Sequence, residues 1–379
     1  MRPPTGPRLR VGIDATPLLG RQTGIGVYTR NLLNALAAGS ELSIVATAFS
    51  STGTSGLAGR LPDGVTAHGR RIPARLLQRS WLSARQPPVE FLCGGVDVFH
   101  ATNFVLPPLR AARGVVSVHD LSFLRYPQFA TRDTARYATL VPVSVRRARA
   151  VCALTAAMAD EIAEQYRVER DDVRVVPPGI DDDWFEAKPL AEAALAGLGL
   201  PPRFLVAVGT LEPRKNLPML IEAFRRLRGQ DERTPPLVLV GPPGWGPRLD
   251  LGGLPAGSVV TTGYLDAATL RSVVASSCGL AFPSVYEGFG LPPLEALACG
   301  VPAVASDLAV TREVLGTAAT LVPGDDPDAL CEALRAAVAD DRDTVDGRER
   351  ALRRREHARQ WTWQRTAESA LAAYRHALG

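Results

Sequence analysis

The segment from 280 to 306, LAFPSVYEGFGLPPLEALACGVPAVAS, limits the possible folds of this chain more than any other. Leu280–Phe282 and Val301–Ala305 are short apolar runs, typical of buried strands in a parallel sheet. Between them, Pro292 and Pro293 suit the first turn of a helix, where a missing N–H costs nothing. The segment therefore predicts strand, loop, helix and strand, which is the repeating unit of an α/β fold.

The loop in front of this helix combines hydrogen-bond donors with carboxylates. Gly288, Phe289 and Gly290 lead straight into the helix N-terminus. The amides and the positive dipole end there can bind a phosphate, and each such contact stabilises it by about 0.3 to 1 kcal/mol. Glu287 precedes the loop and Glu295 follows it, and carboxylates accept hydrogen bonds from sugar hydroxyls. Each glutamate alone could be solvated or could complement the helix dipole. Together with the loop between them, they favour a nucleotide-sugar site.

The segment EGFGLPPLEALACGVPAVAS resembles the signature of the retaining, nucleotide-sugar-dependent glycosyltransferases with the two-domain GT-B fold, of the group 1 and family 4 type. This resemblance implies that Glu287 holds the donor sugar and Glu295 the ribose. It also implies that the amides of three loop residues lie near the phosphates: Phe289, Gly290 and Leu291.

A chain of 379 residues is long for one core and predicts two domains. The resemblance covers essentially the whole chain and implies two Rossmann-like, doubly wound parallel sheets facing across a cleft. We expect an acceptor-binding domain over 1–185, a nucleotide-sugar-binding domain over 186–358, and a helix over 359–379 that returns to the first domain.

In the first half, Gly24 and Gly26 precede a helix-like run and could form only a tight turn, but the resemblance places them near the donor diphosphate and the acceptor. His119 ends the run GVVSVH and is followed by Asp120, whose carboxylate favours an imidazolium that could exchange or donate a proton. A hydrogen-bonded core histidine is the alternative. The resemblance places His119 beside the transferred sugar, and the segment around His100 also resembles a recurrent family segment.

In the second half, Arg214 and Lys215 follow the predicted strand Phe204–Val208 and precede a helix. Such cations suit a phosphate, with charge-assisted hydrogen bonds of roughly 1.5 to 3 kcal/mol each, although a solvated surface pair is the alternative. The family usually has an arginine directly after the strand-end glycine and a lysine five residues later. This chain has Thr210 at the first place and keeps Lys215, so we expect Arg214 to replace the missing arginine.

The resemblance assigns the nucleotide base to Gly263, Tyr264 and Leu265. The five cysteines are widely spaced without a CxxC pair, and the five histidines are scattered. We therefore predict no metal site and no required cofactor.

The net charge is +4, and arginines gather in 70–85 and 146–149. Solvated basic surfaces are the default interpretation, and peripheral contact of the N-terminal domain with an anionic membrane is the alternative; we expect no nucleic-acid partner. The longest apolar runs fall short of the ~20 residues of a membrane span, and the first residues lack an apolar signal region. We expect a cytoplasmic protein, with peripheral location at the inner face of the cell membrane left open.

The predicted function is transfer of a hexose, with retention, from a nucleoside diphosphate sugar to a hydroxyl of a glycan, lipid-linked or small-molecule acceptor. The expected catalytic residues are His119, Glu287, Lys215 and Arg214. GTLEPRKN and VYEGFGLPPLEA look most like bacterial mannosyl- or rhamnosyltransferases of polysaccharide assembly, which favours GDP-mannose, with UDP-glucose or another NDP-hexose next. The alternatives are a GT-B sugar-nucleotide epimerase or phosphorylase and a non-catalytic nucleotide-sugar-binding protein.

Overall fold

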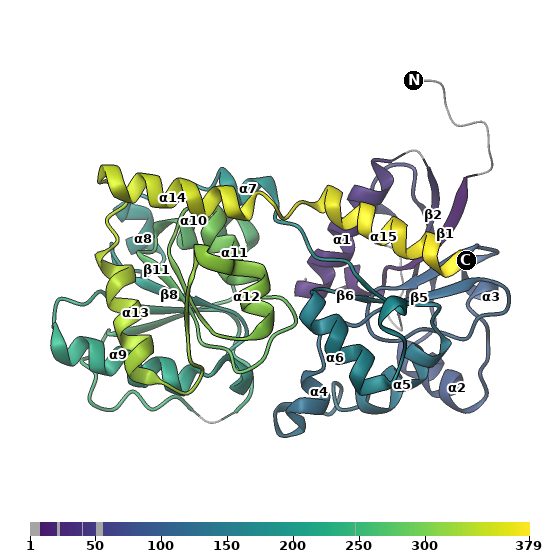
Figure 1. Ribbon diagram of the computed structural model, residues 1–379, viewed down its shortest axis with the longest axis horizontal. Helices are drawn as coiled ribbons and strands as arrows, with labels where there is room; N and C mark the ends of the chain where they lie inside the picture. The colour runs from purple at the N-terminus through teal and green to yellow at the C-terminus, as the bar shows by residue number, and fades with distance from the viewer. Residues whose placement is uncertain (1–7, 21–22, 40, 51–55, 247) are drawn as a thin grey trace. The chain divides into compact units, whose positions relative to one another are not determined.

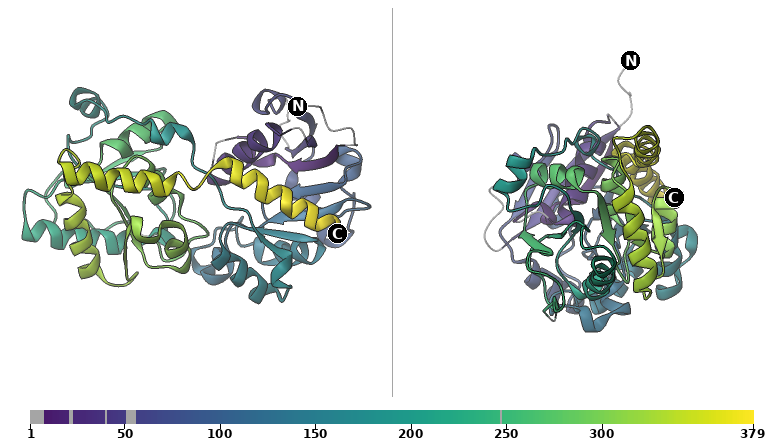
Figure 2. Two further views of the ribbon diagram at one scale, coloured as in Figure 1. Left: turned by 45° about the horizontal axis from the view of Figure 1, so that its top comes forward. Right: turned by 90° about the vertical axis from the view of Figure 1, so that its left-hand side faces the viewer.

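The computed structural model describes residues 8–20, 23–39, 41–50, 56–246 and 248–379. The chain forms two compact units, one of residues 1–179 with 362–379 and the other of residues 180–361 (Figure 1). The domain limits predicted from the sequence, after residues 185 and 358, lie within a few residues of the observed limits after 179 and 361. Each unit is built on one parallel sheet with helices packed on it (Figure 2).

The first unit contains a seven-stranded sheet in the order β3-β2-β1-β4-β5-β6-β7. Its strands are β1 (Leu9–Asp14), β2 (Leu42–Phe49), β3 (Thr66–Arg70), β4 (Val98–Ala101), β5 (Arg113–Ser117), β6 (Ala150–Ala153) and β7 (Val173–Val175). The chain builds outward from β1 to β3 and then crosses to the other side of β1, where β4 pairs in parallel with Ile13 opposite His100. This switch point is where doubly wound sheets bind ligands, at the carboxyl ends of the strands.

The helices of the first unit are α1 (Gly24–Ala37), α2 (Ala74–Ser83), α3 (Glu90–Cys93), α4 (Ser122–Arg125), α5 (Tyr137–Arg147), α6 (Ala156–Tyr166) and α15 (Trp363–Leu378). The hydroxyl of Thr155 accepts from Met158 N at 3.1 Å, so it caps α6 as its sequence position predicts. Pro142 lies inside α5, where the buried Val141 and Val145 hold the helix on the sheet. The C-terminal α15 packs on α1 and on β4 to β7 (Figure 1).

The second unit contains a six-stranded sheet in the order β10-β9-β8-β11-β12-β13. Its strands are β8 (Leu205–Val208), β9 (Leu237–Val240), β10 (Val259–Gly263), β11 (Gly279–Phe282), β12 (Ala303–Ser306) and β13 (Thr320–Val322). Its helices are α7 (Asp182–Phe185), α8 (Glu192–Gly197), α9 (Leu217–Gln230), α10 (Ala267–Ser276), α11 (Leu291–Ala298), α12 (Ala309–Leu315), α13 (Pro327–Ala339) and α14 (Val345–Ala358). The switch point lies between β8 and β11, so the residues after these two strands meet at one edge.

The chain passes between the units twice, after Gly179 and before Thr362. The N–H of Ile180 donates to the carbonyl of Trp361 at 2.9 Å. A Cβ on Gly179 would lie 2.3 Å from the backbone nitrogen of Trp363, so only glycine permits this approach. Within the described ranges, the search for a helix of sufficient length and apolarity to span a membrane found none.

Candidate functional site

Glu287 lies between two cations at the carboxyl edge of the second sheet. Its Oε1 is 2.8 Å from Lys215 Nζ, and its Oε2 is 2.7 Å from an Arg214 guanidinium nitrogen. Arg214 also contacts Glu212 Oε1 at 2.7 Å, so two cations and two carboxylates form one cluster. Burial would raise the pKa of Glu287, but Arg214 and Lys215 outweigh it and hold this pKa at about 2. Glu287 is therefore a fixed anion at neutral pH.

Lys215 reaches this position across the end of β8. Its Nζ lies 4.4 Å from the centre of the Phe282 ring, within the range of a cation–π contact. Gly209 has a φ of 143°, and a Cβ there would lie 3.0 Å from Lys215 Cε. The strand-end glycine thus provides both the backbone turn and the space for the lysine.

All three guanidinium nitrogens of Arg214 make contacts in the cluster. Besides Glu212 and Glu287, it donates to the carbonyl of Tyr286 at 2.9 Å. Its contacts hold Glu287 and the start of the glycine loop in place. The structure thus brings Glu287, Lys215 and Arg214 together, and adds Glu212, which the sequence analysis missed although it stands two residues before Arg214.

The loop after Glu287 presents backbone donors. Gly290 has a φ of 101°, in the left-handed region that favours glycine, and α11 begins at the next residue, Leu291. No described residue accepts a hydrogen bond from the N–H groups of Phe289, Gly290 or Leu291. The first N–H groups of a helix have no partner within the helix, and such donors after a glycine loop suit a bound anion.

Glu295 lies one turn into α11, behind this loop. Burial, and to a smaller extent the charge of Asp181, raise the pKa of its carboxyl to about 8 against the opposing effect of Arg271. Among the residues that the structure describes, none forms a hydrogen bond with this carboxyl. Near neutral pH Glu295 is therefore mostly protonated, and it can donate as well as accept a hydrogen bond.

The three predicted base-contact residues lie at the same edge of the sheet. Gly263 ends β10 with a φ of 70°, and its carbonyl accepts from Gly241 N at 2.9 Å. Tyr264 follows and is half-exposed, while Leu265 is partly buried. In the strand order, β10 stands two strands from β8, so these residues lie about 10 Å from the Lys215 strand. This spacing suits the distance from a base to a diphosphate.

In the first unit, His119 follows β5 and its Nε2 lies 2.7 Å from the carbonyl oxygen of Thr102. A carbonyl only accepts, so Nε2 carries the proton and Nδ1 is an acceptor. Burial lowers the pKa of His119, and the Thr102 contact and Asp120 offset only part of the shift. The predicted imidazolium is therefore wrong: burial outweighs the neighbouring carboxylate, which instead accepts from Ser122 N at 2.9 Å.

The ring of His119 packs against aromatic side chains. The ring centroid of Tyr28, on α1, lies 5.2 Å from it, and that of Phe104 lies 5.5 Å away. Gly26 is needed for packing, because a Cβ there would lie 2.9 Å from a backbone oxygen, whereas a Cβ on Gly24 would meet nothing within 4 Å. The tight-turn interpretation thus explains Gly26, and Gly24 has no such packing role.

His100 is a core histidine. Its Nδ1 lies 2.8 Å from the Tyr374 hydroxyl, and its Nε2 lies 2.8 Å from Ser117 Oγ. Burial lowers its pKa to about 3, and His119 adds to the shift. His100 therefore ties α15 to the sheet and does not act as an acid or base. Asp14, at the carboxyl end of β1, was not among the predicted site residues; burial raises its pKa, which marks it as a further polar group at this edge.

Two families match this chain: residues 202–340 match "Glycosyl transferases group 1", and residues 22–184 match "Glycosyltransferase Family 4". The D-inositol 3-phosphate glycosyltransferase of Stackebrandtia nassauensis is 31% identical over 321 residues, which are 78% of this chain and 70% of the relative. The chain belongs to the group 1 glycosyltransferases. The O-antigen chain mannosyltransferase B of Escherichia coli is 29% identical over 289 residues, covering 73% of this chain and 74% of the relative.

The solved structure of HepE from Anabaena in complex with UDP and glucose supports the same fold for this group 1 glycosyltransferase. It superposes with a TM-score of 0.67 at 18% identity, and covers 96% of this chain and 98% of that chain. The predicted GT-B fold is confirmed. The match to two glycosyltransferase families and to bacterial mannosyltransferases supports glycosyltransferase activity over the epimerase, phosphorylase and binding-protein alternatives.

Proposed function

We propose that this glycosyltransferase moves a hexose from a nucleoside diphosphate sugar to a hydroxyl acceptor with retention of configuration. The observation that carries the proposal is the position of Glu287, held by Lys215 and Arg214 directly before the free amides of the glycine loop. Cations and amides at one strand edge suit a diphosphate, and a carboxylate beside them suits sugar hydroxyls.

The leaving diphosphate is stabilised by Lys215 and by the N-terminus of α11. Lys215 Nζ has three N–H donors, of which one is directed at Glu287, so others remain for a phosphate oxygen. The amides of Phe289, Gly290 and Leu291 add donors that are fixed by the backbone. Groups oriented in advance toward developing charge stabilise a transition state without reorganisation.

Glu287 is poorly suited to act as a covalent nucleophile. Both carboxylate oxygens contact cations, and its pKa of about 2 makes the oxygens weakly basic. We therefore favour attack of the acceptor on the face from which the diphosphate departs, with the departing phosphate taking the acceptor proton, over a glycosyl-enzyme intermediate. Glu287 would orient the sugar by accepting hydrogen bonds from its hydroxyls.

His119 would contribute an acceptor from the first unit. Its Nε2–H is used by Thr102, which leaves Nδ1 to accept from a hydroxyl of the donor sugar. His119 then positions the sugar as a neutral imidazole and does not transfer a proton.

The donor we favour is GDP-mannose, because one relative is an O-antigen chain mannosyltransferase. UDP-glucose is the competing donor, because HepE was solved with UDP and glucose. The acceptor would be a hydroxyl of a glycan, a lipid-linked molecule or a small molecule.

Thermal unfolding with GDP, UDP, dTDP and ADP, each alone and as its sugar conjugate, tests the proposal. A nucleotide at ~100 times its dissociation constant should add about 2.7 kcal/mol of stability. Lys215→Ala and Glu295→Ala should lose this gain, and Lys188→Ala, at an exposed lysine of the same unit, should keep it. If no nucleotide stabilises the wild type, or if Lys215→Ala responds like Lys188→Ala, the diphosphate site is wrongly placed.

Peripheral membrane contact is a separate proposal for the first unit. Leu76 and Leu82 of α2 and Phe91 of α3 are exposed, and Arg79 and Arg85 lie nearby in the chain. Exposed apolar side chains among arginines suit an anionic lipid surface. Cosedimentation with phosphatidylglycerol vesicles should exceed that with phosphatidylcholine vesicles and should fall for Phe91→Ser. Equal binding to both, or no effect of Phe91→Ser, would contradict this contact.

A further inference from the structure

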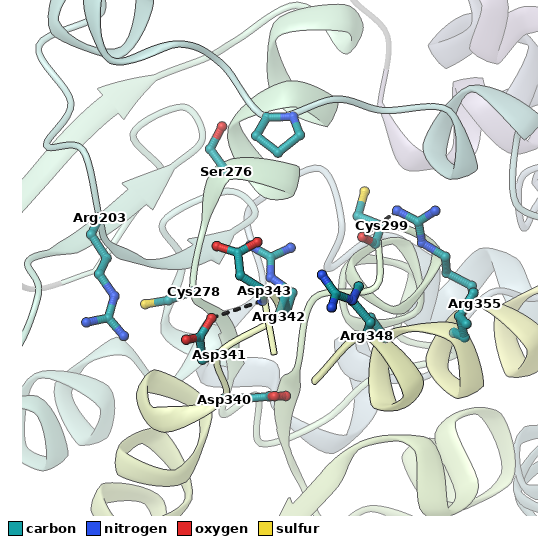
Figure 3. A pocket seen from close by; sticks show the side chains of 13 residues that line it. Arg203, Ser276, Cys278, Cys299, Asp340, Asp341, Arg342, Asp343, Arg348 and Arg355 are labelled. Atoms are coloured by element: carbon teal, nitrogen blue, oxygen red, sulfur yellow. Dashed lines mark hydrogen bonds between the residues drawn. The ribbon is translucent and has the colours of Figure 1, made fainter. Parts of the chain in front are cut away.

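A cavity of about 740 Å³ lies in the second unit at the edge of the sheet opposite to the glycine loop (Figure 3). Its lining includes Arg203, which precedes β8, and Cys278, which precedes β11. Lys215 and Glu287 follow these same two strands at their carboxyl ends. The cavity is therefore at the amino edge of the sheet and is not part of the proposed donor site.

Three of the four arginines that line this cavity donate only to backbone carbonyl groups. The guanidinium of Arg342 donates to Ser277 O at 2.7 Å and to Ala275 O at 3.2 Å. Those of Arg203 and Arg355 likewise donate to carbonyls, and the Nε of Arg355 is buried without any described partner. Carbonyls satisfy N–H groups but do not neutralise a charge.

The fourth arginine, Arg348, has an exposed side chain for which the described residues provide no hydrogen-bond or ion-pair partner. The lining aspartate Asp340 forms its ion pairs with Arg350 and Arg354, and its charge opposes only part of the effect of burial on Arg342. In the view of Figure 3, the side chains of Arg342 and Arg348 lie between those of Arg203 and Arg355. The cavity thus has four arginines and no carboxylate paired with any of them.

Two further carboxylates, Asp341 and Asp343, also line the cavity, and both side chains are exposed. Asp341 accepts from the backbone N–H of Asp343 at 2.9 Å, and neither carboxylate lies within ion-pair distance of a lining arginine in the part of the chain that the structure describes. Because both carboxylates are exposed, solvent screens their effect on the lining arginines. They would accept hydrogen bonds from hydroxyls of a bound molecule.

A partly buried cation without a counter-charge is costly. Burial lowers the pKa of Arg342, which reflects this cost. A phosphate would reduce it, because the planar guanidinium donates two parallel hydrogen bonds to phosphate oxygens. The volume also lies within the range of small-molecule sites, roughly 300 to 1,000 Å³.

We propose that this cavity binds a small phosphorylated molecule, with its phosphate on Arg342, Arg348 and Arg355, at a site separate from the donor site. The C-terminal end of α11 borders the cavity, because Arg355 donates to the carbonyl of Cys299 directly after this helix. The N-terminal end of α11 carries the donor loop. A molecule bound in the cavity would therefore act as an effector and not as the substrate.

The test is calorimetric titration of inorganic phosphate into Lys215→Ala, in which the donor site is disabled, at constant ionic strength. We expect saturable binding at one site in this background. Adding Arg348→Gln should weaken it by about tenfold or more, the equivalent of ~1.4 kcal/mol. Adding Arg353→Gln should not, because Arg353 lies on the same helix but pairs with Glu349 and does not line the cavity. If Lys215→Ala does not fold, wild type with a saturating excess of the nucleotide that stabilises it most in thermal unfolding replaces it.

Three outcomes would overturn the proposal. The first is non-saturating binding, and the second is equal weakening by Arg348→Gln and Arg353→Gln, which would indicate a general charge effect of α14. The third is phosphate binding that requires Lys215, which would assign the phosphate to the donor loop. The third outcome would leave the proposed function intact, so failure of this inference is distinguishable from failure of that function.

Discussion

The Nζ of Lys215 lies 2.8 Å from Oε1 of Glu287, although the two residues are 72 positions apart in the sequence. The predicted phosphate ligand and the predicted sugar ligand are therefore bonded to each other. Each fixes the orientation of the other before any donor enters. Replacing one should affect both the phosphate and the sugar parts of the site.

Lysine labelling should report occupancy of the donor site directly, because Lys188 and Lys215 are the only lysines in the sequence. Lys188 is exposed, whereas Lys215 is held in the cluster. We expect an amine-reactive reagent to label Lys188 quickly and Lys215 slowly, and a bound nucleotide to slow only Lys215, by about fivefold or more at saturation. Peptide mass spectrometry measures both rates. If no nucleotide changes the labelling rate of Lys215, its proposed role in binding the diphosphate is contradicted.

Glu287→Gln should destabilise the second unit by about 3 kcal/mol near neutral pH, because it leaves two partly buried cations short of one carboxylate. The wild-type pKa of about 2 lies below the unfolded value, so this carboxylate stabilises fully above the unfolded pKa and loses its effect as pH falls toward 2. Urea unfolding should show the difference between variant and wild type shrinking below about pH 4.5. Glu222→Gln, at an exposed ion pair, is the control and should change the stability little, because solvent screens the pair.

Gly290→Ala should abolish nucleotide binding at a moderate cost in stability. A φ of 101° strains any other residue by roughly 1 to 2 kcal/mol, and relief of the strain would turn the loop amides away. Gly199→Ala has a comparable backbone, with a φ of 69° and open space around the new Cβ, but it is remote from the loop in sequence. Both variants should lose similar stability in thermal unfolding. Retention of nucleotide binding by Gly290→Ala would mean that the amides do not hold the phosphate.

Glu295→Gln should stabilise the protein at alkaline pH. The pKa of about 8 lies above that of an unfolded glutamate, so the folded state holds the extra proton and its stability falls as pH rises from about 4.5 to about 8. The neutral amide avoids this loss. We expect a gain of roughly 2 kcal/mol near pH 9 and almost none near pH 5 in urea unfolding. A gain of equal size at both pH values would show that titration of Glu295 is not its cause.

His119→Asn should lower kcat by about 10- to 100-fold through loss of the Nδ1 acceptor toward the sugar. Binding of the nucleotide without its sugar should not change. Burial lowers the pKa of His119, so imidazolium forms only below the usual histidine range, and a loss of wild-type activity caused by its protonation should appear below about pH 6.5. The activity profile against pH tests this expectation. An equal loss of nucleotide binding in the variant would indicate a structural role.

Much of the fold followed from local signals in the sequence. The apolar runs 280–282 and 301–305 form most of β11 and β12, and the prolines at 292 and 293 lie in the first turn of α11. These signals can be recognised in the sequence because strand burial, proline geometry and helix termination by glycine depend on only a few neighbouring residues. Pro142 is tolerated inside α5, because packing of its neighbours on the sheet outweighs one lost hydrogen bond.

The partners of the site residues could not be predicted in the same way. The sequence indicated that Lys215, Arg214 and Glu287 suit a phosphate and a sugar, but only the order of β8 and β11 in the sheet makes them bond to one another. The sequence also predicted that His119 lies at a strand end. It could not predict the tautomer and the lowered pKa of His119, which depend on the contact with Thr102 and on burial. Residue type and spacing thus determined which chemistry the chain can carry. Tertiary structure decided the charge states and contacts, because burial and distant neighbours set them and neither is local in sequence.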